Sequence, residues 1–288
     1  MKKKIGFIDY FLDEWHANNL PNWLKNAKRG EEFELYMAYG EIEPPMENKL
    51  SNAQWCEQNN VKLAKSIDEL VEACDCICVL APSNPETHYR LAEKALMSGK
   101  NTYIDKPFAP SLAEAKAIFE LAEKYNTKCF SSSALRFADG MKEIMAFEYK
   151  PCDSALALVK GSGNNFPEYV IHMLEMITCF IGTGAEKVIY NGAGAYEHQL
   201  MIAYPDKRTA ALTMLPGGPY GMVANRHLDT VCIDKMENFF ENFVDALLDF
   251  FADGAVPVNP DETLAVAALV EAAVKAQQKP GEWVNVPA

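Results

Sequence analysis

Short apolar runs alternate with amphipathic stretches over the first 135 residues. The apolar runs have the length and residue types of strands, and the stretches between them repeat apolar positions at helical spacing. Predicted strands cover 4–8, 32–39, 61–64, 76–82, 101–105 and 128–134, and predicted helices cover 52–60, 66–74, 85–99 and 111–126. Strands that alternate with helices pair in parallel through right-handed crossovers. The pattern predicts an α/β domain with a doubly wound parallel sheet over residues 1–135.

Serine residues mark two of these helix starts. Ser66 is followed three residues later by Glu69, and Ser111 is followed by Glu114. A serine with an acidic residue at this spacing is typical of a capping box. The helices are therefore expected to begin just after the two serines.

The pattern changes in the second half of the chain. Predicted strands cover 154–161, 187–192, 198–205, 208–215 and 227–233, and predicted helices cover 167–182, 236–254 and 260–278. Consecutive strands without intervening helices favour antiparallel pairing. We therefore expect residues 136–288 to form a second, α+β domain with a largely antiparallel, open sheet, its final helix packing back on the first domain.

Composition narrows the class of protein. The chain has 288 residues, of which 49% are hydrophobic, and 27 basic against 40 acidic side chains give a net charge of -13. This acidity argues against nucleic acid or an anionic membrane as a partner. The chain shows no apolar run of membrane-spanning length and no apolar core of a signal peptide after its first lysines. We expect a globular protein of the cytoplasm.

The eight cysteines contain no CxxC pair, which favours free thiols. Cys74, Cys76 and Cys78 could be interpreted as a soft-metal site. Their period of two within an apolar strand places them on one face, where small buried thiols are much commoner. We expect no metal site.

The strand ends hold the candidate chemistry, because ligands of doubly wound sheets bind at the carboxyl ends of the strands. Four segments between 79 and 137 follow an ordered set of motifs. They are Pro82, Ser83 and Asn84 with His88, then Gly99 and Lys100, then Asp105, Lys106 and Pro107, and then Leu135, Arg136 and Phe137. The set resembles the Gfo/Idh/MocA family, named for glucose-fructose oxidoreductase, inositol dehydrogenase and MocA.

The resemblance implies a Rossmann-type first domain and an NAD(P)-dependent oxidoreductase acting on a sugar, cyclitol or related polyol. It implies that Pro82, Ser83, Asn84, His88, Asp105, Lys106 and Arg136 line the cofactor site. It also implies a homo-oligomer that pairs through the open face of the second sheet. In the family the lysine contacts the nicotinamide ribose and the substrate, and the Lys-Pro bond is often cis.

Lys106 is the first candidate catalytic residue. A lysine at a strand end, followed by Pro107, projects an ammonium toward the position of a hydride acceptor. The ammonium can polarise a substrate hydroxyl and share its proton. Asp105 stands where the family has glutamate, so the charge is kept and the reach is shorter. The alternative is a surface lysine paired with Asp105.

The helix 167–182 carries the other candidate catalytic residues. Glu168, His172 and Glu175 share one stripe at helical spacing, opposite a stripe of apolar residues. His172 could act as general base, with a carboxylate orienting its ring or binding a substrate hydroxyl. The stripe resembles the family's Asp-x-x-x-His-x-x-Asp helix, with glutamate at both acidic positions. The alternative is a solvated polar face with an incidental histidine.

The turn after the first strand conflicts with a dinucleotide site. Asp9 and Phe11 occupy the positions of the family's Gly-x-Gly turn, and Asp13 and Glu14 follow. A carboxylate about 4 Å from a phosphate charge costs roughly 4 kcal/mol at an effective dielectric of about 20. Binding at about 1 μM is worth only about 8 kcal/mol. Two such contacts would cancel the affinity unless the side chains turn away.

Glu41 is the candidate acid for the cofactor ribose, because it follows the second strand. A carboxylate at this position favours NAD over NADP. Two functions from different classes therefore remain open. The first is the NAD(P)-dependent oxidoreductase, for which redox-assisted glycoside cleavage is a variant. The second is a non-catalytic relative that has lost dinucleotide binding and serves as a small-molecule binding or regulatory module.

Overall fold

The computed structural model describes every residue except 193, 195 and 196. The chain divides into two compact units. The first comprises Met1–Ser132 and Val244–Pro260, and the second comprises Ser133–Phe243 and Asp261–Ala288. The predicted boundary after residue 135 falls close to the division after Ser132. Residues 244–260, predicted for the second domain, instead belong to the first unit.

The sheet of the first unit is parallel throughout its described pairs, with strand order β3-β2-β1-β4-β5-β6. This confirms the predicted doubly wound sheet. Its strands are β1 (Lys3–Asp9), β2 (Phe33–Gly40), β3 (Lys62–Leu63), β4 (Cys76–Val79), β5 (Thr102–Ile104) and β6 (Cys129–Phe130). The apolar runs of β1 and β4 are buried because helices cover both faces of the sheet.

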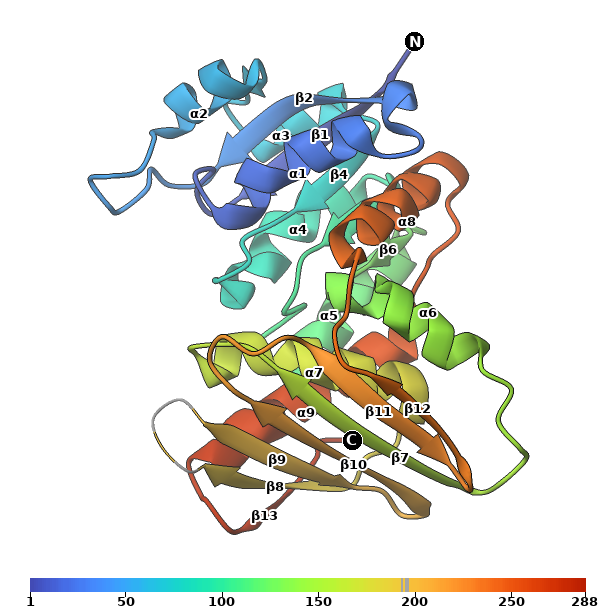
Figure 1. Ribbon diagram of the computed structural model, residues 1–288. Helices are drawn as coiled ribbons and strands as arrows, with labels where there is room; N and C mark the ends of the chain where they lie inside the picture. The colour runs from blue at the N-terminus through green and yellow to red at the C-terminus, as the bar shows by residue number, and fades with distance from the viewer. Residues whose placement is uncertain (193, 195–196) are drawn as a thin grey trace. The chain divides into compact units, whose positions relative to one another are not determined.

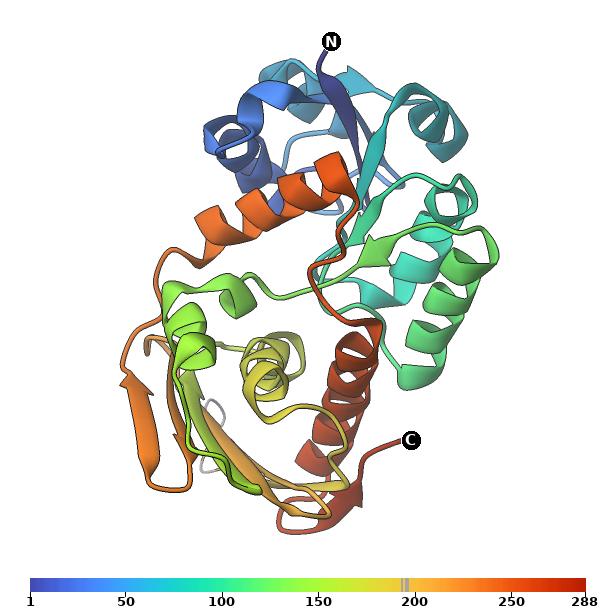
Figure 2. The same cartoon turned by 90° about the vertical axis from the view of Figure 1, so that its right-hand side faces the viewer.

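The helices of the first unit lie on both faces of this sheet. They are α1 (Trp15–Asn26), α2 (Asn52–Asn59), α3 (Ile67–Ala73), α4 (His88–Met97) and α5 (Leu112–Lys124). Helix α1 lies on one face, and α3, α4 and α5 lie on the other (Figures 1 and 2). Helix α1 is absent from the pattern-based prediction, because its sequence is polar and contains Pro21.

The predicted serine caps are present. The hydroxyls of Ser66 and Ser111 accept hydrogen bonds from the backbone N–H groups of Glu69 and Glu114. The carboxylate of Glu69, however, accepts from the N–H of Lys65 at 2.7 Å, so it does not return to Ser66. A reciprocal capping box occurs instead at the start of α2, between Ser51 and Gln54.

The C-terminal part of helix α8 (Phe239–Asp253) packs against the amino-terminal edge of this sheet. Lys3, Asn101 and Lys128 lie at or just before the starts of β1, β5 and β6. Their side chains donate hydrogen bonds to the carbonyl oxygens of Phe251, Phe250 and Gly254 at 2.8–3.1 Å. These contacts explain why residues 244–260 cluster with the first unit. Because α8 covers the amino-terminal edge, we look for a ligand site at the opposite, carboxyl-terminal edge of the sheet.

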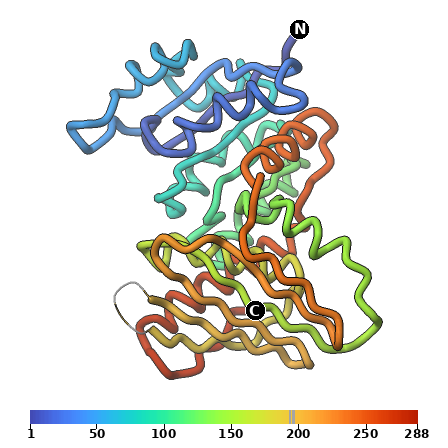
Figure 3. Tube along the Cα trace, in the orientation of Figure 1, coloured from blue at the N-terminus to red at the C-terminus, as the bar shows by residue number. Residues whose placement is uncertain are grey.

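The sheet of the second unit has seven strands in the order β12-β11-β7-β10-β9-β8-β13, and only β7 and β10 pair in parallel among its described pairs. This confirms a largely antiparallel sheet; Figure 3 traces its strands side by side. The strands are β7 (Ser154–Gly161), β8 (Lys187–Gly192), β9 (His198–Ala203), β10 (Lys207–Met214), β11 (Gly221–Arg226), β12 (Asp229–Ile233) and β13 (Trp283–Asn285). The strands β11 and β13 were not predicted.

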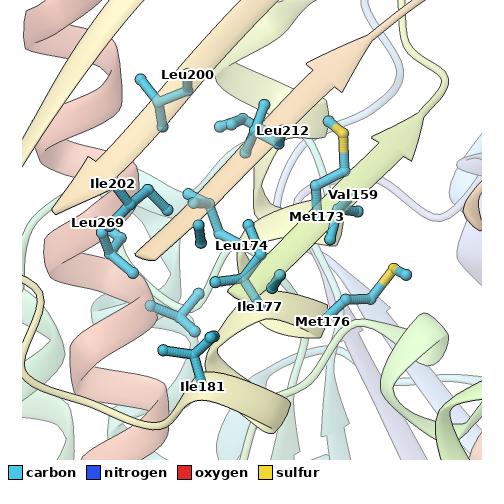
Figure 4. Packing of buried hydrophobic residues seen from close by; sticks show 14 of the residues in the cluster. Val159, Met173, Leu174, Met176, Ile177, Ile181, Leu200, Ile202, Leu212 and Leu269 are labelled. Atoms are coloured by element: carbon cyan, nitrogen blue, oxygen red, sulfur yellow. The ribbon is translucent and has the colours of Figure 1, made fainter. Parts of the chain in front are cut away.

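The core of the second unit lies between one face of this sheet and two helices, α7 (Phe166–Ile181) and α9 (Pro260–Gln277) (Figure 2). Met173, Leu174 and Ile177 of α7 meet Leu212 of the sheet and Leu269 of α9 (Figure 4). The final helix α9 thus contributes to the core of the second unit. Helix α6 (Asp139–Ala146) completes the unit. Among the described residues, no helix is both long and apolar enough to cross a membrane.

We expect Leu174→Ala to destabilise the second unit by about 2–5 kcal/mol, because Leu174 is fully buried and truncation leaves a cavity. The matched control is Leu158→Ala on β7, whose side chain is 42% exposed. The control should change stability by no more than about 0.5 kcal/mol. Urea unfolding measured for both variants checks this, and equal losses would contradict the packing described.

Candidate functional site

Asp9 ends β1 and is turned into the fold. One carboxylate oxygen, Oδ1, accepts hydrogen bonds from the backbone N–H groups of Tyr10 at 2.7 Å and Ala81 at 3.0 Å. The side chain is fully buried, and Oδ2 has no hydrogen-bond partner among the described atoms. Burial raises the pKa of Asp9 well above its ordinary value, and the charges of Glu14 and Asp105 add to the effect. The hydrogen bonds from Tyr10 and Ala81 act in the opposite direction, and burial outweighs them.

Asp13 is held by the segment that precedes α2. Its carboxylate accepts hydrogen bonds from Asn18 Nδ2 at 2.7 Å and from the N–H of Leu50 at 2.8 Å. Lys49 Nζ donates to the carbonyl oxygen of Asp13 at 2.7 Å. The Leu12 N–H donates to Asn52 Oδ1 at 3.0 Å. The turn is thus anchored to residues 49–52 rather than left open.

These contacts test whether a dinucleotide phosphate fits this turn. Of the three carboxyl groups that seemed to oppose it, Asp9 is buried and Asp13 is engaged by neighbouring donors. Helix α1 begins directly after the turn, and no side-chain hydrogen bond caps its N-terminus. An uncapped helix N-terminus at the carboxyl end of β1 suits a phosphate. The side chains of Phe11 and Leu12 are buried, so the turn after β1 leaves less room for a phosphate than a glycine turn would.

Asp105 organises the end of β5. It forms an ion pair with His16 Nδ1, and its other oxygen accepts from the Tyr103 hydroxyl and from the N–H of Lys106, both at 2.8 Å. Burial alone would raise the pKa of Asp105. The neighbouring His16 and Lys106 charges and the Tyr103 hydrogen bond outweigh burial and lower it to about 2. The pKa of Asp105 is therefore shifted in the opposite direction from that of Asp9.

Lys106 follows directly, with its side chain only 8% exposed and the Lys106–Pro107 bond cis. His88 links the loop that carries Lys106 to the end of β4. The His88 ring nitrogens lie 3.0 Å from the carbonyl oxygen of Phe108 and 2.7 Å from that of Leu80. His88, predicted for the cofactor site, is fully buried and engaged by the backbone. These contacts give His88 a role in positioning the loop that carries Lys106.

The remaining predicted cofactor residues lie in the loop after β4 and after β2. Pro82 is buried, Ser83 is exposed, and Asn84 Nδ2 donates to Glu86 Oε1 at 3.0 Å. Glu41 forms an ion pair with Arg90 on the first turn of α4. The pair was not anticipated, because 49 residues separate its members in the sequence.

Two polar sets occupy the second unit. His172 Nδ1 lies 2.7 Å from the hydroxyl of Ser133, which precedes the short 3-10 helix η3 (Ala134–Phe137). Tyr169 and Tyr220 flank the His172 ring, with centroids 5.9 and 5.8 Å away. Glu168, on the preceding turn, is half-buried and accepts from Asn165. A serine hydroxyl therefore contacts this ring nitrogen.

Arg136 and Glu175 form a buried ion pair. Arg136 Nε donates to Glu175 Oε1 at 2.9 Å, and Arg136 Nη2 lies 2.6 Å from Glu262 Oε2 as a charge contact. Burial would lower the pKa of Arg136, but the charges of Glu175 and Glu262 raise it. Arg136, predicted for the cofactor site, and Glu175, predicted for the polar stripe of α7, are thus paired inside the second unit.

The predicted residues therefore gather in two places. Asp9, Phe11, Glu41, Asp105 and Lys106 lie at or next to the carboxyl edge of the first sheet. His172 and Glu168 share α7 in the second unit. Cys74, Cys76 and Cys78 are all buried, as expected for structural thiols. The fold is that of the Rossmann-type class of proteins.

Residues 21–133 match a family model described as an oxidoreductase family with an NAD-binding Rossmann fold, Gfo/Idh/MocA. This match confirms, over these residues, the resemblance predicted from the motifs.

Individual relatives agree. An uncharacterized oxidoreductase of Schizosaccharomyces pombe is 34% identical over 94 residues, 33% of this chain and 24% of the relative. The myo-inositol 2-dehydrogenase of Thermotoga maritima is 22% identical over 57% of this chain and 54% of the relative. The matched segment thus spans only about a quarter of the first curated relative and about half of the second.

Solved structures extend the likeness in fold to the whole chain. The WlbA dehydrogenase of Bordetella pertussis, solved in complex with NADH and UDP-GlcNAcA, superposes with a TM-score of 0.79 at 12% identity. The comparison covers 100% of both chains. At this identity the likeness shows the fold alone.

Asp9→Asn should lose less stability than the wild type as the pH rises from 5 to 9. A raised pKa means that the native state retains a proton which the unfolded chain releases above about pH 4. The contribution of Asp9 to stability is therefore full below that pH and falls as the pH rises toward its folded pKa. The asparagine keeps the oxygen that accepts from Tyr10 and Ala81 and has no proton to lose.

The melting temperatures of wild type and variant, measured between pH 5 and 9, check this. The advantage of the variant should widen as the pH rises. Asp105 acts with the opposite sign, because its pKa is lowered to about 2. Its contribution to stability is present above about pH 4 and is lost as the pH falls toward about 2. Asp105 is present in both proteins and titrates below pH 5, so its own titration does not change the difference in melting temperature between pH 5 and 9. A gap that does not change with pH would show that Asp9 is ionised in the native state.

Proposed function

We propose that the protein is an NAD(P)-dependent oxidoreductase that transfers a hydride between a nicotinamide cofactor and a sugar, cyclitol or related polyol. One observation carries the proposal. Lys106 is nearly buried at the carboxyl edge of the parallel sheet, where Asp105 and His88 fix its loop. This is the edge at which doubly wound sheets bind their cofactors.

The chain's own residues supply binding and proton transfer. When bound, the cofactor accepts or donates the hydride. Lys106 Nζ binds the substrate hydroxyl and polarises it. His172 takes the hydroxyl proton as general base, and the proposal assigns this proton to Nε2 because Nδ1 is hydrogen bonded to Ser133. Glu168, one turn before His172 on α7, binds a second substrate hydroxyl.

The names of related proteins support a polyol substrate. The Thermotoga maritima relative is named a myo-inositol 2-dehydrogenase, and the Bordetella pertussis structure holds a sugar nucleotide beside NADH. The proposal extends such a substrate class to this chain. It also includes the cytoplasmic location expected from the sequence and the homo-oligomer that the resemblance implies. Leu158 and Met201 are exposed on the sheet face opposite α7 and α9, at positions that both pair with Ala211 of β10, and this apolar face suits self-association.

A second candidate is a binding or regulatory module that has lost its dinucleotide. The turn after β1 favours it, because the N–H groups of Tyr10, Leu12 and Glu14 already donate within the protein. A glycine turn would offer its N–H groups to the pyrophosphate instead. The two candidates differ in whether any nicotinamide dinucleotide binds.

Thermal unfolding with NAD and NADP, each oxidised and reduced, separates these candidates. The oxidoreductase proposal predicts a higher melting temperature with at least one of the four at millimolar concentration, since a ligand of the native state raises stability. No shift with any of them would sink the oxidoreductase proposal and leave the binding module.

Lys106→Met should abolish turnover of the polyol that the wild type oxidises, because the ammonium is lost and the apolar stem is kept. The matched control is Lys124→Met at the exposed end of α5, which should leave the rate unchanged. Circular dichroism of both variants reports whether the fold is intact. A Lys106→Met enzyme that is folded and as fast as wild type would remove the lysine from the mechanism.

A further inference from the structure

An ion pair spans the end of β1. Glu41 directly follows β2, and Arg90 lies on the first turn of α4, after β4. Strand β1 lies between β2 and β4 in the sheet, so the pair reaches across the strand end at which the turn 9–14 begins. The position of Glu41 is fixed by the backbone, because its N–H donates to the carbonyl oxygen of Asp9 at 3.0 Å.

The guanidinium of Arg90 engages both carboxylate oxygens of Glu41. Nε donates to Oε1 at 2.8 Å, and Nη2 donates to Oε2. This two-pronged contact occupies the oxygens that an acid after β2 would offer to the ribose hydroxyls. The structure therefore does not favour the simple expectation that Glu41 binds the ribose of NAD.

The pair is accessible to an incoming anion. The side chain of Arg90 is 55% exposed and that of Glu41 is 24% exposed. Exposed ion pairs contribute little to stability, so a phosphate can replace the carboxylate at small cost. The hydrogen bond to Glu41 raises the pKa of Arg90, and Tyr10 and Glu86 act in the same direction. Glu86 is itself engaged by Asn84.

We propose that Arg90 binds a phosphate of the dinucleotide and that Glu41 holds it in place until the nucleotide arrives. Arg90 thereby supplies, from α4, the positive charge and the forked donors that this turn lacks without glycines. The inference rests on the proposed function, since it concerns the same cofactor. It assigns Glu41 the role of a competitor for Arg90 rather than a ligand of the ribose.

Calorimetric titration of NAD and NADP into three proteins tests this. Arg90→Gln should weaken at least one of the two nucleotides about tenfold. A loss confined to NADP would assign Arg90 to the 2′-phosphate, and an equal loss for both would assign it to the pyrophosphate; either result supports the proposal. Glu41→Gln should strengthen binding several-fold, because it releases Arg90. Weaker binding to Glu41→Gln would overturn the assignment and restore Glu41 as the ribose ligand.

The control is Glu32→Gln, which removes an acidic partner of Arg29 before the start of β2, away from the carboxyl edge. It should leave both affinities unchanged. If wild type binds a nucleotide and Arg90→Gln binds it equally well, the inference fails while the proposed function stands. If wild type binds neither nucleotide, both are overturned.

Discussion

The carboxyl group of Asp9 is the constraint on which the nucleotide edge of the first unit depends. One oxygen joins the end of β1 to the end of β4 through the N–H groups of Tyr10 and Ala81. The other lies buried without a partner among the described atoms. Such a group is costly as an anion and tolerable as an acid. Its burial raises the pKa of Asp9 and so disfavours a charge that would oppose a pyrophosphate at this turn.

The rest of the first unit leads to the same edge. The end of α8 packs against the starts of the strands, and its carbonyl oxygens accept from Lys3, Asn101 and Lys128. At the other end, His88 fastens the lysine loop to β4, while the charged Asp105 holds His16 and the backbone of Lys106. The two aspartates at the ends of β1 and β5, the strands on either side of β4, thus have pKa values shifted in opposite directions. Burial dominates at Asp9, and surrounding donors dominate at Asp105.

The sequence predicts the parts of the fold that local pattern determines. Alternating strands and helices give the parallel sheet, and the apolar stripe of α7 gives its buried face. Helix α1 escapes the pattern because polar residues and Pro21 conceal its periodicity. The strands β11 and β13 also escape, since β11 contains glycine, alanine and asparagine, which are depleted in strands, and β13 has only three residues. Local sequence cannot predict that the end of α8 packs on the first unit, because the partners of Phe250 and Phe251 lie more than a hundred residues away in the chain.

The candidate site divides in the same way. Lys106 and His172 are found from motifs, because their neighbours in sequence form the pattern. Ser133 beside His172, Arg90 beside Glu41 and Glu262 beside Arg136 are contacts between distant segments, and only the folded chain places them together.

The most direct test of this account is the ¹³C chemical shift of the Asp9 carboxyl carbon, followed by NMR from pH 3 to pH 9 in protein labelled at aspartate, with Asp9→Asn used to assign the resonance. We expect the carbon to keep the shift of a protonated acid well above the pH at which ordinary aspartates have titrated. A carboxylate shift that is already complete near pH 4 would contradict it. Asp9 would then be ionised in the folded protein, and the turn after β1 would carry its negative charge.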